Sequence, residues 1–276
     1  MSVVVPDCNH GQNAGGRLER FAFVFSLEQL DAIRTAEIDR IVPFLAPGSR
    51  ILELGAGIGQ QALALRRRGF EVTAVEIAGS AYAAHRVFPV IDYDGSTLPL
   101  PDRSVDVVFS SNVLEHVRSL ERMHLEIRRV LRARGTCIHV LPTHSWRFWS
   151  LLTGYPDALL YLLFGLPHLL PRALPRRPEL GRLAAAWHAT AYNVGGRVFP
   201  HRHGERGNVV SEIWLFHPRW WRRHFAENGF SVLHDASMGL FYTGNMLLGR
   251  RLGLARRRRL ARLLGSACHL FVLAPR

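Results

Sequence analysis

Apolar residues recur along the chain in two alternating patterns. From Ser26 onward, Leu27, Leu30, Ile33 and Ile38 lie near helical spacing, and Ser26 with Gln29 forms a capping box, which predicts an amphipathic helix. Further along, short apolar runs typical of buried strands are separated by helical stretches. The strand-like runs are 50–54, 71–77, 89–93, 105–110, 136–141, 230–235 and 269–274.

Helical patterns fill most of the gaps between these runs, at residues 60–68, 81–86, 114–131 and 218–228. Strands that alternate with helices at this spacing form parallel sheets covered on both faces. The pattern predicts an α/β fold: a Rossmann-like, doubly wound, mostly parallel seven-stranded sheet. Ligands bind such sheets at the carboxyl ends of the strands.

The alternation stops after residue 141 and resumes near residue 217, leaving a segment rich in Leu, Pro, Arg and His. So long an interval is unusual for a connecting loop. We expect a helical or loop insertion after the fifth strand, on the substrate side. Four parts are predicted: an N-terminal helical segment 1–44, a Rossmann-like core 45–141, the insertion or lid 142–216, and a C-terminal helix with the last strands, 217–276.

A glycine-rich loop lies between the first predicted strand and the next helix. It reads Glu53-Leu-Gly55-Ala-Gly57-Ile-Gly59. Glycines at such a turn let the backbone bend tightly and let a ligand approach closely. A dinucleotide fingerprint needs a further glycine where Gln60 stands, so the loop predicts a nucleotide-type ligand of another kind.

Acidic residues follow at regular distances. Glu76 ends the second predicted strand, 21 residues after Gly55, where a carboxylate can accept both hydroxyls of a ribose. Asp94 comes 18 residues later, after the third strand, and Asp92 could take the same role. The fourth strand then leads into Leu-Glu115-His116.

These elements together closely resemble class I S-adenosylmethionine-dependent methyltransferases, whose pattern reads LELGxGxG…D…LPFxDxSFDxV…LEH. The resemblance covers about residues 45–142, and Leu100 and Val105 replace the usual phenylalanines. It implies S-adenosylmethionine as cofactor and methyl transfer as activity. It also implies that Glu53 orients the loop or meets the amino group, that Glu76 binds the ribose, and that Asp94 with Gly95 or Ser96 reads the adenine. The remaining positions are expected to hold the methionine and ribose or to lie beside the sulfonium: Gly55, Ala56, Gly57, Gly59, Ser111 and Asn112.

Methyl transfer from a sulfonium is an in-line displacement, so an enzyme holds donor and acceptor together and deprotonates an acceptor hydroxyl. Ser110-Ser-Asn-Val stands where amino-group methylases of bases carry D/N-P-P-Y/F; this leaves O-, C- or small-amine methylation open. His144 directly follows the fifth strand and is a candidate catalytic residue, with a structural role as the equal alternative. His116 is interpreted as packing beside the cofactor.

The segment 200–208 concentrates ionisable groups between two glycines. His203 and Glu205 are predicted to serve substrate binding and catalysis, and Arg202 or Arg206 to recognise an anionic group by its fork of donors. His201, His203 and Glu205 could share one side of an extended segment and bind a metal. Because no fourth ligand is evident, we expect no metal; a solvated polar loop is the alternative.

Composition limits the class of protein. Of 276 residues, 48% are apolar and 21% charged, which excludes a disordered chain, a collagen-like repeat and a coiled coil. The three cysteines lie far apart and exclude a disulfide framework or a zinc ribbon. Residues 1–140 carry 16 Arg and 16 acidic residues, whereas 141–276 carry 19 Arg and 6 acidic residues. The second half is therefore expected to face an anionic partner.

Two features of the sequence limit the kind of partner that this protein binds. The apolar stretch 158–166 precedes several arginines, as in a segment lying in a membrane interface, but a lid packing on the sheet is the slightly favoured interpretation. Neither a secretory signal nor a span of transmembrane length is evident, so we expect a cytoplasmic protein; peripheral contact at the inner face of the membrane stays an open alternative. The favoured function is methylation of a small or lipid-linked, anionic acceptor, such as a glycan, a quinone precursor or a polyprenyl phosphate. The alternatives are an RNA methyltransferase, with nucleic acid the less favoured partner, and a non-catalytic cofactor-binding protein.

Overall fold

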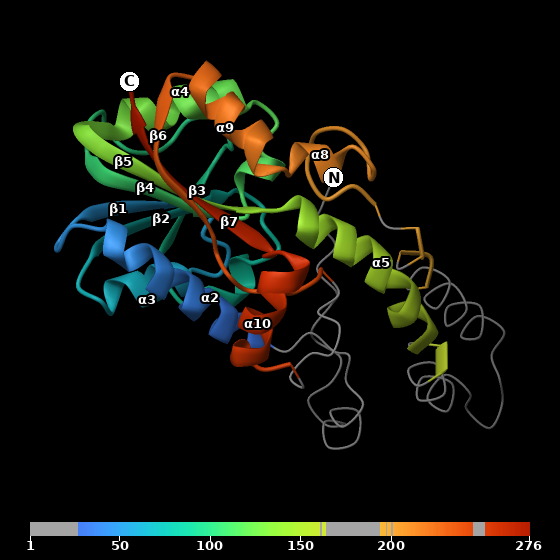
Figure 1. The fold of residues 1–276 in the computed structure, drawn as a ribbon. Helices are drawn as coiled ribbons and strands as arrows, with labels where there is room; N and C mark the ends of the chain where they lie inside the picture. Colours follow the sequence, from blue (N-terminus) through green and yellow to red (C-terminus); the bar gives the residue numbers. More distant parts are fainter. Residues whose placement is uncertain (1–26, 161, 164–193, 197, 200, 245–251) are drawn as a thin grey trace, which may run out of the picture.

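A seven-stranded sheet forms the centre of the computed structural model, which describes residues 27–160, 162–163, 194–196, 198–199, 201–244 and 252–276 (Figure 1). The strand order is β3-β2-β1-β4-β5-β7-β6. Strands β1 to β5 pair in parallel, whereas β7 is antiparallel to both β5 and β6. The predicted mostly parallel seven-stranded sheet is confirmed. Its strands are β1 (Arg50–Leu54), β2 (Glu71–Ile77), β3 (Val90–Tyr93), β4 (Val105–Ser111), β5 (Leu131–Pro142), β6 (Phe230–Ser237) and β7 (Cys268–Pro275).

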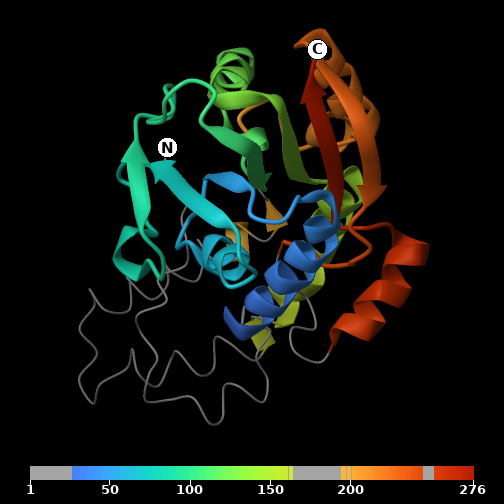
Figure 2. The ribbon, with the colours of Figure 1, turned by 90° about the vertical axis from the view of Figure 1, so that its left-hand side faces the viewer.

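Helices cover both faces of the sheet (Figure 2). One apolar core lies between the sheet and helices α4 and α9, and a second lies between the sheet and α2 and α3. The described helices are α2 (Leu27–Ile41), α3 (Gln60–Arg66), α4 (Leu120–Val130), α5 (His144–Leu160), α8 (Glu212–Leu215), α9 (Pro218–Glu227) and α10 (Leu254–Leu264). Short 3-10 turns are η1 (Val42–Phe44), η2 (Ala83–His85) and η3 (Leu114–His116).

Strand β1 shows why these residues form a central strand. Leu52 and Leu54 pack in the core beneath α4, whereas Ile51 packs in the core beneath α2 and α3. Successive side chains of a strand point to opposite faces, and both faces here are covered. The strand is therefore apolar on both sides, as parallel strands usually are. The glycine loop follows directly at its carboxyl end.

The helix predicted over 114–131 is interrupted. It consists of the turn η3 and the separate helix α4, with residues 117–119 between them. The Arg206 guanidinium donates to the carbonyls of Leu114 (3.1 Å) and Val117 (2.9 Å). These carbonyls would otherwise accept from amides one turn later in a continuous helix, so Arg206 stabilises the break.

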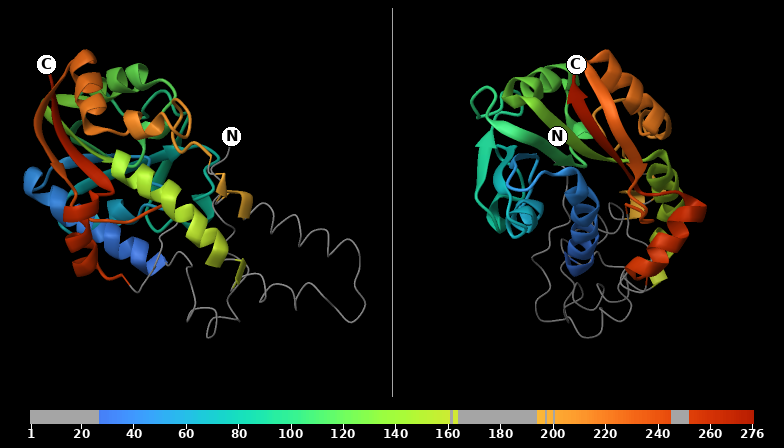
Figure 3. Two further views of the ribbon diagram at one scale, coloured as in Figure 1. Left: turned by 45° about the vertical axis from the view of Figure 1, so that its right-hand side comes forward. Right: turned by 60° about the vertical axis from the view of Figure 1, so that its left-hand side comes forward.

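The predicted insertion begins with helix α5 directly after β5 and points away from the sheet (Figure 3). Helix α10, which precedes β7, was not among the predicted helices. The apolar stretch 158–166 extends beyond the described residues, so the prediction for it lies partly outside them. The limits of the four predicted parts stay predictions.

A buried histidine leads to a testable prediction about the free energy of unfolding at acid pH. His139 of β5 is fully buried, its Nδ1 lies 2.8 Å from Ser110 Oγ, and burial lowers its pKa to about 3. At His139 the unfolded state therefore binds more protons below pH 6.5, and the contribution of this residue to stability falls from there toward pH 3. For His139 alone we expect a loss of about 2 kcal/mol between pH 7.5 and 5.

Urea unfolding at several pH values measures this loss. His139→Gln, which titrates in neither state, is expected to show a smaller pH dependence than the wild type. Equal pH dependence of the unfolding free energy in the wild type and in His139→Gln contradicts the prediction.

Candidate active site

The glycine loop connects β1 to α3 with three glycines in the left-handed region. The φ angles of Gly55, Gly57 and Gly59 are +71°, +57° and +82°. A Cβ on Gly55 would lie 2.5 Å from the Val113 side chain, and one on Gly59 would lie 2.6 Å from Phe88. At Gly57 the nearest atoms are Tyr82 ring carbons at 3.7 Å. Packing therefore requires glycine at the first and third positions, whereas Gly57 leaves space that a ligand can enter.

Two acidic residues hold this loop. Glu76 at the end of β2 accepts from the amides of Gly57 (2.7 Å) and Ile77 (3.1 Å), and the amide of Ala56 donates to the Val75 carbonyl. Glu53 is 2% exposed, and its Oε2 has no hydrogen-bond partner among the described residues. Burial raises the pKa of Glu53 to about 8. A buried carboxylate oxygen that lacks a partner, beside an open glycine cradle, fits the ammonium group of S-adenosylmethionine.

Asp94 closes a turn after β3. One carboxylate oxygen accepts from the amides of Ser96 and Thr97, and the other accepts from the Ser96 hydroxyl. These bonds lower the pKa of Asp94 to about 2, and Gly95 adopts a φ of +79°. The neighbouring Asp92 is paired with Arg86. Contact of Asp94 and Gly95 with adenine stays a prediction.

Ser111 and Asn112 lie at the end of β4, next to the glycine loop. Asn112 has a φ of +54°, and its amide donates to the Val140 carbonyl at 2.8 Å. The Ser111 hydroxyl accepts from Arg34 of α2 at 3.0 Å. Arg34 also lies 2.7 Å from the side-chain amide of Asn112, whose oxygen accepts from it once the amide is turned toward it.

Sequence reasoning missed the polar network behind these two residues. Arg34 pairs with the buried Glu37 at 2.6 Å. The Tyr242 hydroxyl donates to Glu37 at 3.1 Å and lies 3.0 Å from Cys268 Sγ. Tyr242 and Glu37 are 205 positions apart, and no sequence signal links such distant elements.

A second polar cluster lies just beyond Asn112. Glu115 is 1% exposed, and neither of its carboxylate oxygens has a hydrogen-bond partner among the described residues. His116 Nε2 lies 3.8 Å and His203 Nε2 lies 3.9 Å from Glu115 Oε1. Burial raises the pKa of Glu115 to about 8 and lowers the pKa values of both histidines. We refer to Glu115, His116 and His203 as the acceptor cluster.

The insertion places His203 in this cluster. Glu212 of α8 accepts from the amides of His203 and Gly204 at 2.6 Å each, and forms a buried ion pair with Arg147 of α5 at 2.8 Å. The ring of Trp146, also from α5, packs on His203 with centroids 4.6 Å apart. Two helices of the predicted insertion therefore position one candidate catalytic side chain.

The other predicted catalytic and substrate-binding residues lie outside the acceptor cluster or at its border. His144 stacks on His217 with ring centroids 4.5 Å apart. The Glu205 carboxylate pairs with Arg118 and Arg202 at 3.5 Å each. Arg206 binds the backbone carbonyls described above. The catalytic roles of His144 and Glu205, and substrate binding by Arg202 and Arg206, stay predictions.

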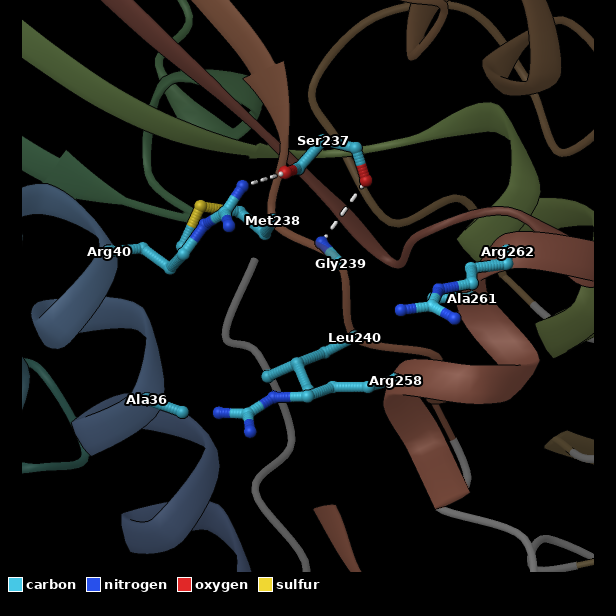
Figure 4. A pocket seen from close by; sticks show the side chains of 9 residues that line it. All are labelled: Ala36, Arg40, Ser237, Met238, Gly239, Leu240, Arg258, Ala261 and Arg262. Carbon is cyan, nitrogen blue, oxygen red and sulfur yellow. Dashed lines mark hydrogen bonds between the residues drawn. The ribbon is translucent and has the colours of Figure 1, made fainter. Parts of the chain in front are cut away.

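The excess of arginine gathers partly at a hollow between α2 and α10, whose lining includes no residue of the glycine loop (Figure 4). Its lining includes Arg40, Arg258 and Arg262, and it encloses about 390 Å³. Arg40 donates to the Ser237 carbonyl at 2.9 Å. Within the described ranges, none of the helices is both long and apolar enough to cross a bilayer.

Comparison with known proteins agrees with this geometry. Residues 52–139 match the model of a methyltransferase domain. An uncharacterized methyltransferase of Mycobacterium sp. (strain JLS) is 36% identical over 208 residues, covering 72% of this chain and 78% of the relative. The demethylmenaquinone methyltransferase of Corynebacterium efficiens is 32% identical over 93 residues, covering 33% and 40% of the two chains.

A similar fold occurs in a solved structure, that of a SAM-dependent methyltransferase from Thermotoga maritima. The two structures superimpose with a TM-score of 0.50 and 16% identity, covering 90% of this chain and 94% of the other. Four observations therefore indicate the same family: the glycine loop, the acidic residues, the fold and the relatives. The chain belongs to the class I S-adenosylmethionine-dependent methyltransferases.

Proposed function

We propose that this methyltransferase acts on a hydroxyl of a small or lipid-linked acceptor that carries an anionic group. The observation that carries the proposal is the position of the acceptor cluster. It lies directly after β4, next to Ser111 and Asn112, and contacts α5 through Trp146. A hydroxyl bound there would meet a group of buried polar side chains that can activate it beside the cofactor loop.

Residues of the first half of the chain would each bind a different part of the cofactor. Glu53 would pair with the ammonium group, Glu76 would accept from the ribose hydroxyls, and the space at Gly57 would admit the methionine part. Glu76 keeps this capacity although it already accepts two amides, because a carboxylate offers about four acceptor sites. The bound cofactor supplies a methyl group on a sulfonium, and the protein aligns the acceptor with it.

Helix α5 supports an apolar or lipid-linked acceptor. Its outward face carries large apolar side chains spaced four, three and four residues apart, with exposed fractions of about one half. They are Phe148 (48%), Leu152 (49%), Tyr155 (58%) and Leu159 (56%). We call these residues the apolar stripe. An exposed stripe of this kind is typical of a surface that binds a partner, and it lies on the helix whose Trp146 packs on His203 of the cluster.

Two further observations favour a small or lipid-linked acceptor that carries an anionic group. The arginine-lined hollow, whose lining contains no residue of the acceptor cluster, would attract an anionic group at the far end of an extended acceptor, and one relative is named for a quinone acceptor. Contact of the apolar stripe with the inner face of the membrane is part of the same proposal, since apolar residues near arginines suit anionic lipid surfaces.

Methyl-labelled cofactor tests the proposal. The purified protein is incubated with a host extract, and label is counted in lipid, small polar, RNA and protein fractions. We expect label in the lipid or small polar fraction. In a Leu152→Ser, Leu159→Ser double variant, labelling of a lipid acceptor should fall while cofactor binding is unchanged. Label in RNA, with a steep dependence on salt, would overturn the choice of acceptor.

A further inference from the structure

We propose that the acceptor cluster binds one first-row divalent transition-metal ion, such as Zn²⁺. Glu115, His116 and His203 each offer one ligand atom, and these atoms all lie within 4.8 Å of one another. Two imidazoles and one carboxylate form a donor set that zinc and its neighbours in the first row prefer. Three protein ligands also leave a coordination position open, as catalytic metal sites do.

The buried carboxylate of Glu115 is the second and independent observation. More than about 90% of buried polar groups have a hydrogen-bond partner, yet both oxygens of Glu115 lack one among the described residues. The nearby Arg206 does not serve, because its guanidinium donates to the carbonyls of Leu114 and Val117. A divalent ion would supply the missing partner and offset the cost of burying the carboxylate.

The surroundings hold the ligands in place as metal sites require. Glu212 fixes the backbone of His203 and Gly204, and the Glu205 amide donates to the Glu115 carbonyl at 2.9 Å. A Cβ on Gly204 would lie 2.9 Å from that carbonyl, so glycine lets the loop approach η3 closely. This ligand set differs from the one that the sequence suggested, since His201 is exposed and Glu205 pairs with arginines.

The role of the ion rests on the proposed function. The ion would coordinate the acceptor oxygen and lower the pKa of its hydroxyl, whose proton passes to water. The oxygen electron pair then forms the new bond to the methyl carbon. The carbon–sulfur bond breaks, and its electron pair stays on sulfur, which becomes a neutral thioether. Charge and atoms balance without a further reactant.

Metal binding by the untagged, full-length protein tests the site without any activity measurement. The protein is stripped with a chelator, dialysed and titrated with Co²⁺, whose visible absorption reports coordination, and with Zn²⁺ by calorimetry. We expect one Co²⁺ per chain, displaced by Zn²⁺. His203→Gln and Glu115→Gln should each weaken binding by more than the roughly 10–100-fold that loss of an outer hydrogen-bond partner costs. His234→Gln, which alters an exposed histidine on β6, should bind as the wild type does.

Three results would overturn the inference: no saturable binding by the wild type, equal binding by a folded His203→Gln variant, or full methyl transfer by protein freed of metal. The last result would leave the proposed function standing. Conversely, an ion that binds at these residues without any label transfer to a host fraction would support the site and contradict the proposed function.

Discussion

Gly57→Arg is expected to abolish methyl transfer while leaving the protein folded. The space at Gly57 is open on the side of the cradle, so the arginine side chain would occupy the volume predicted for the cofactor. We expect cofactor affinity to fall at least about 100-fold, equivalent to about 3 kcal/mol. The positive φ of +57° adds strain, which should lower the free energy of unfolding by about 1–3 kcal/mol.

Gly48→Arg is the matched control for this variant. Gly48 has a φ of +72°, and a Cβ added there would meet no atom within 4 Å, so the substitution carries the same strain at a distance from the cradle. Label transfer and thermal unfolding are measured for both variants. Gly48→Arg should retain cofactor binding at a similar cost in stability. Cofactor binding by Gly57→Arg at wild-type affinity would refute the assignment of the cradle.

Glu212→Ala is expected to lower the free energy of unfolding by about 3–5 kcal/mol, because it leaves Arg147 buried without its partner. Both side chains are almost fully buried, and Glu212 also accepts from the amides of His203 and Gly204. The variant should therefore lose activity as well, since His203 would no longer be held in the acceptor cluster.

Urea unfolding at pH 7.5 measures this effect, with Glu227→Ala as the control. Glu227 forms an exposed pair with Arg223 on α9, and such surface pairs contribute about 0–1 kcal/mol. Glu212→Gln, which keeps an acceptor for the two amides, should fall between the wild type and Glu212→Ala. Equal stability of Glu212→Ala and Glu227→Ala would show that the ion pair does not hold the insertion in place.

The local parts of the fold and the presence of an insertion could be predicted from the sequence, whereas the helices inside the insertion could not. Strands β1 and β2 begin and end where their apolar runs do, because each has buried residues on both faces and is bounded by glycine or polar residues. Helix α5 escaped prediction because its apolar residues lie on more than one face and are interspersed with Arg147, Ser150 and Asp157. Trp146 and Ala158 face the protein, whereas Phe148 and Leu152 are exposed, so no helical period stands out.

The candidate site, like the fold, could be predicted only in part. The glycine loop is one short segment, so its residues could be identified together. The acceptor cluster joins His116 to His203, which comes from the insertion, and the network of Arg34, Glu37 and Tyr242 joins α2 to the segment after β6. Only the packing of the sheet brings these segments together.

Calorimetric titration of the purified wild-type protein with S-adenosylmethionine tests the central claim most directly. We predict saturable binding at one site per chain, competition by S-adenosylhomocysteine, and no binding by the folded Gly57→Arg variant. A folded wild-type protein that binds neither compound would contradict the assignment of the cofactor to this edge of the sheet.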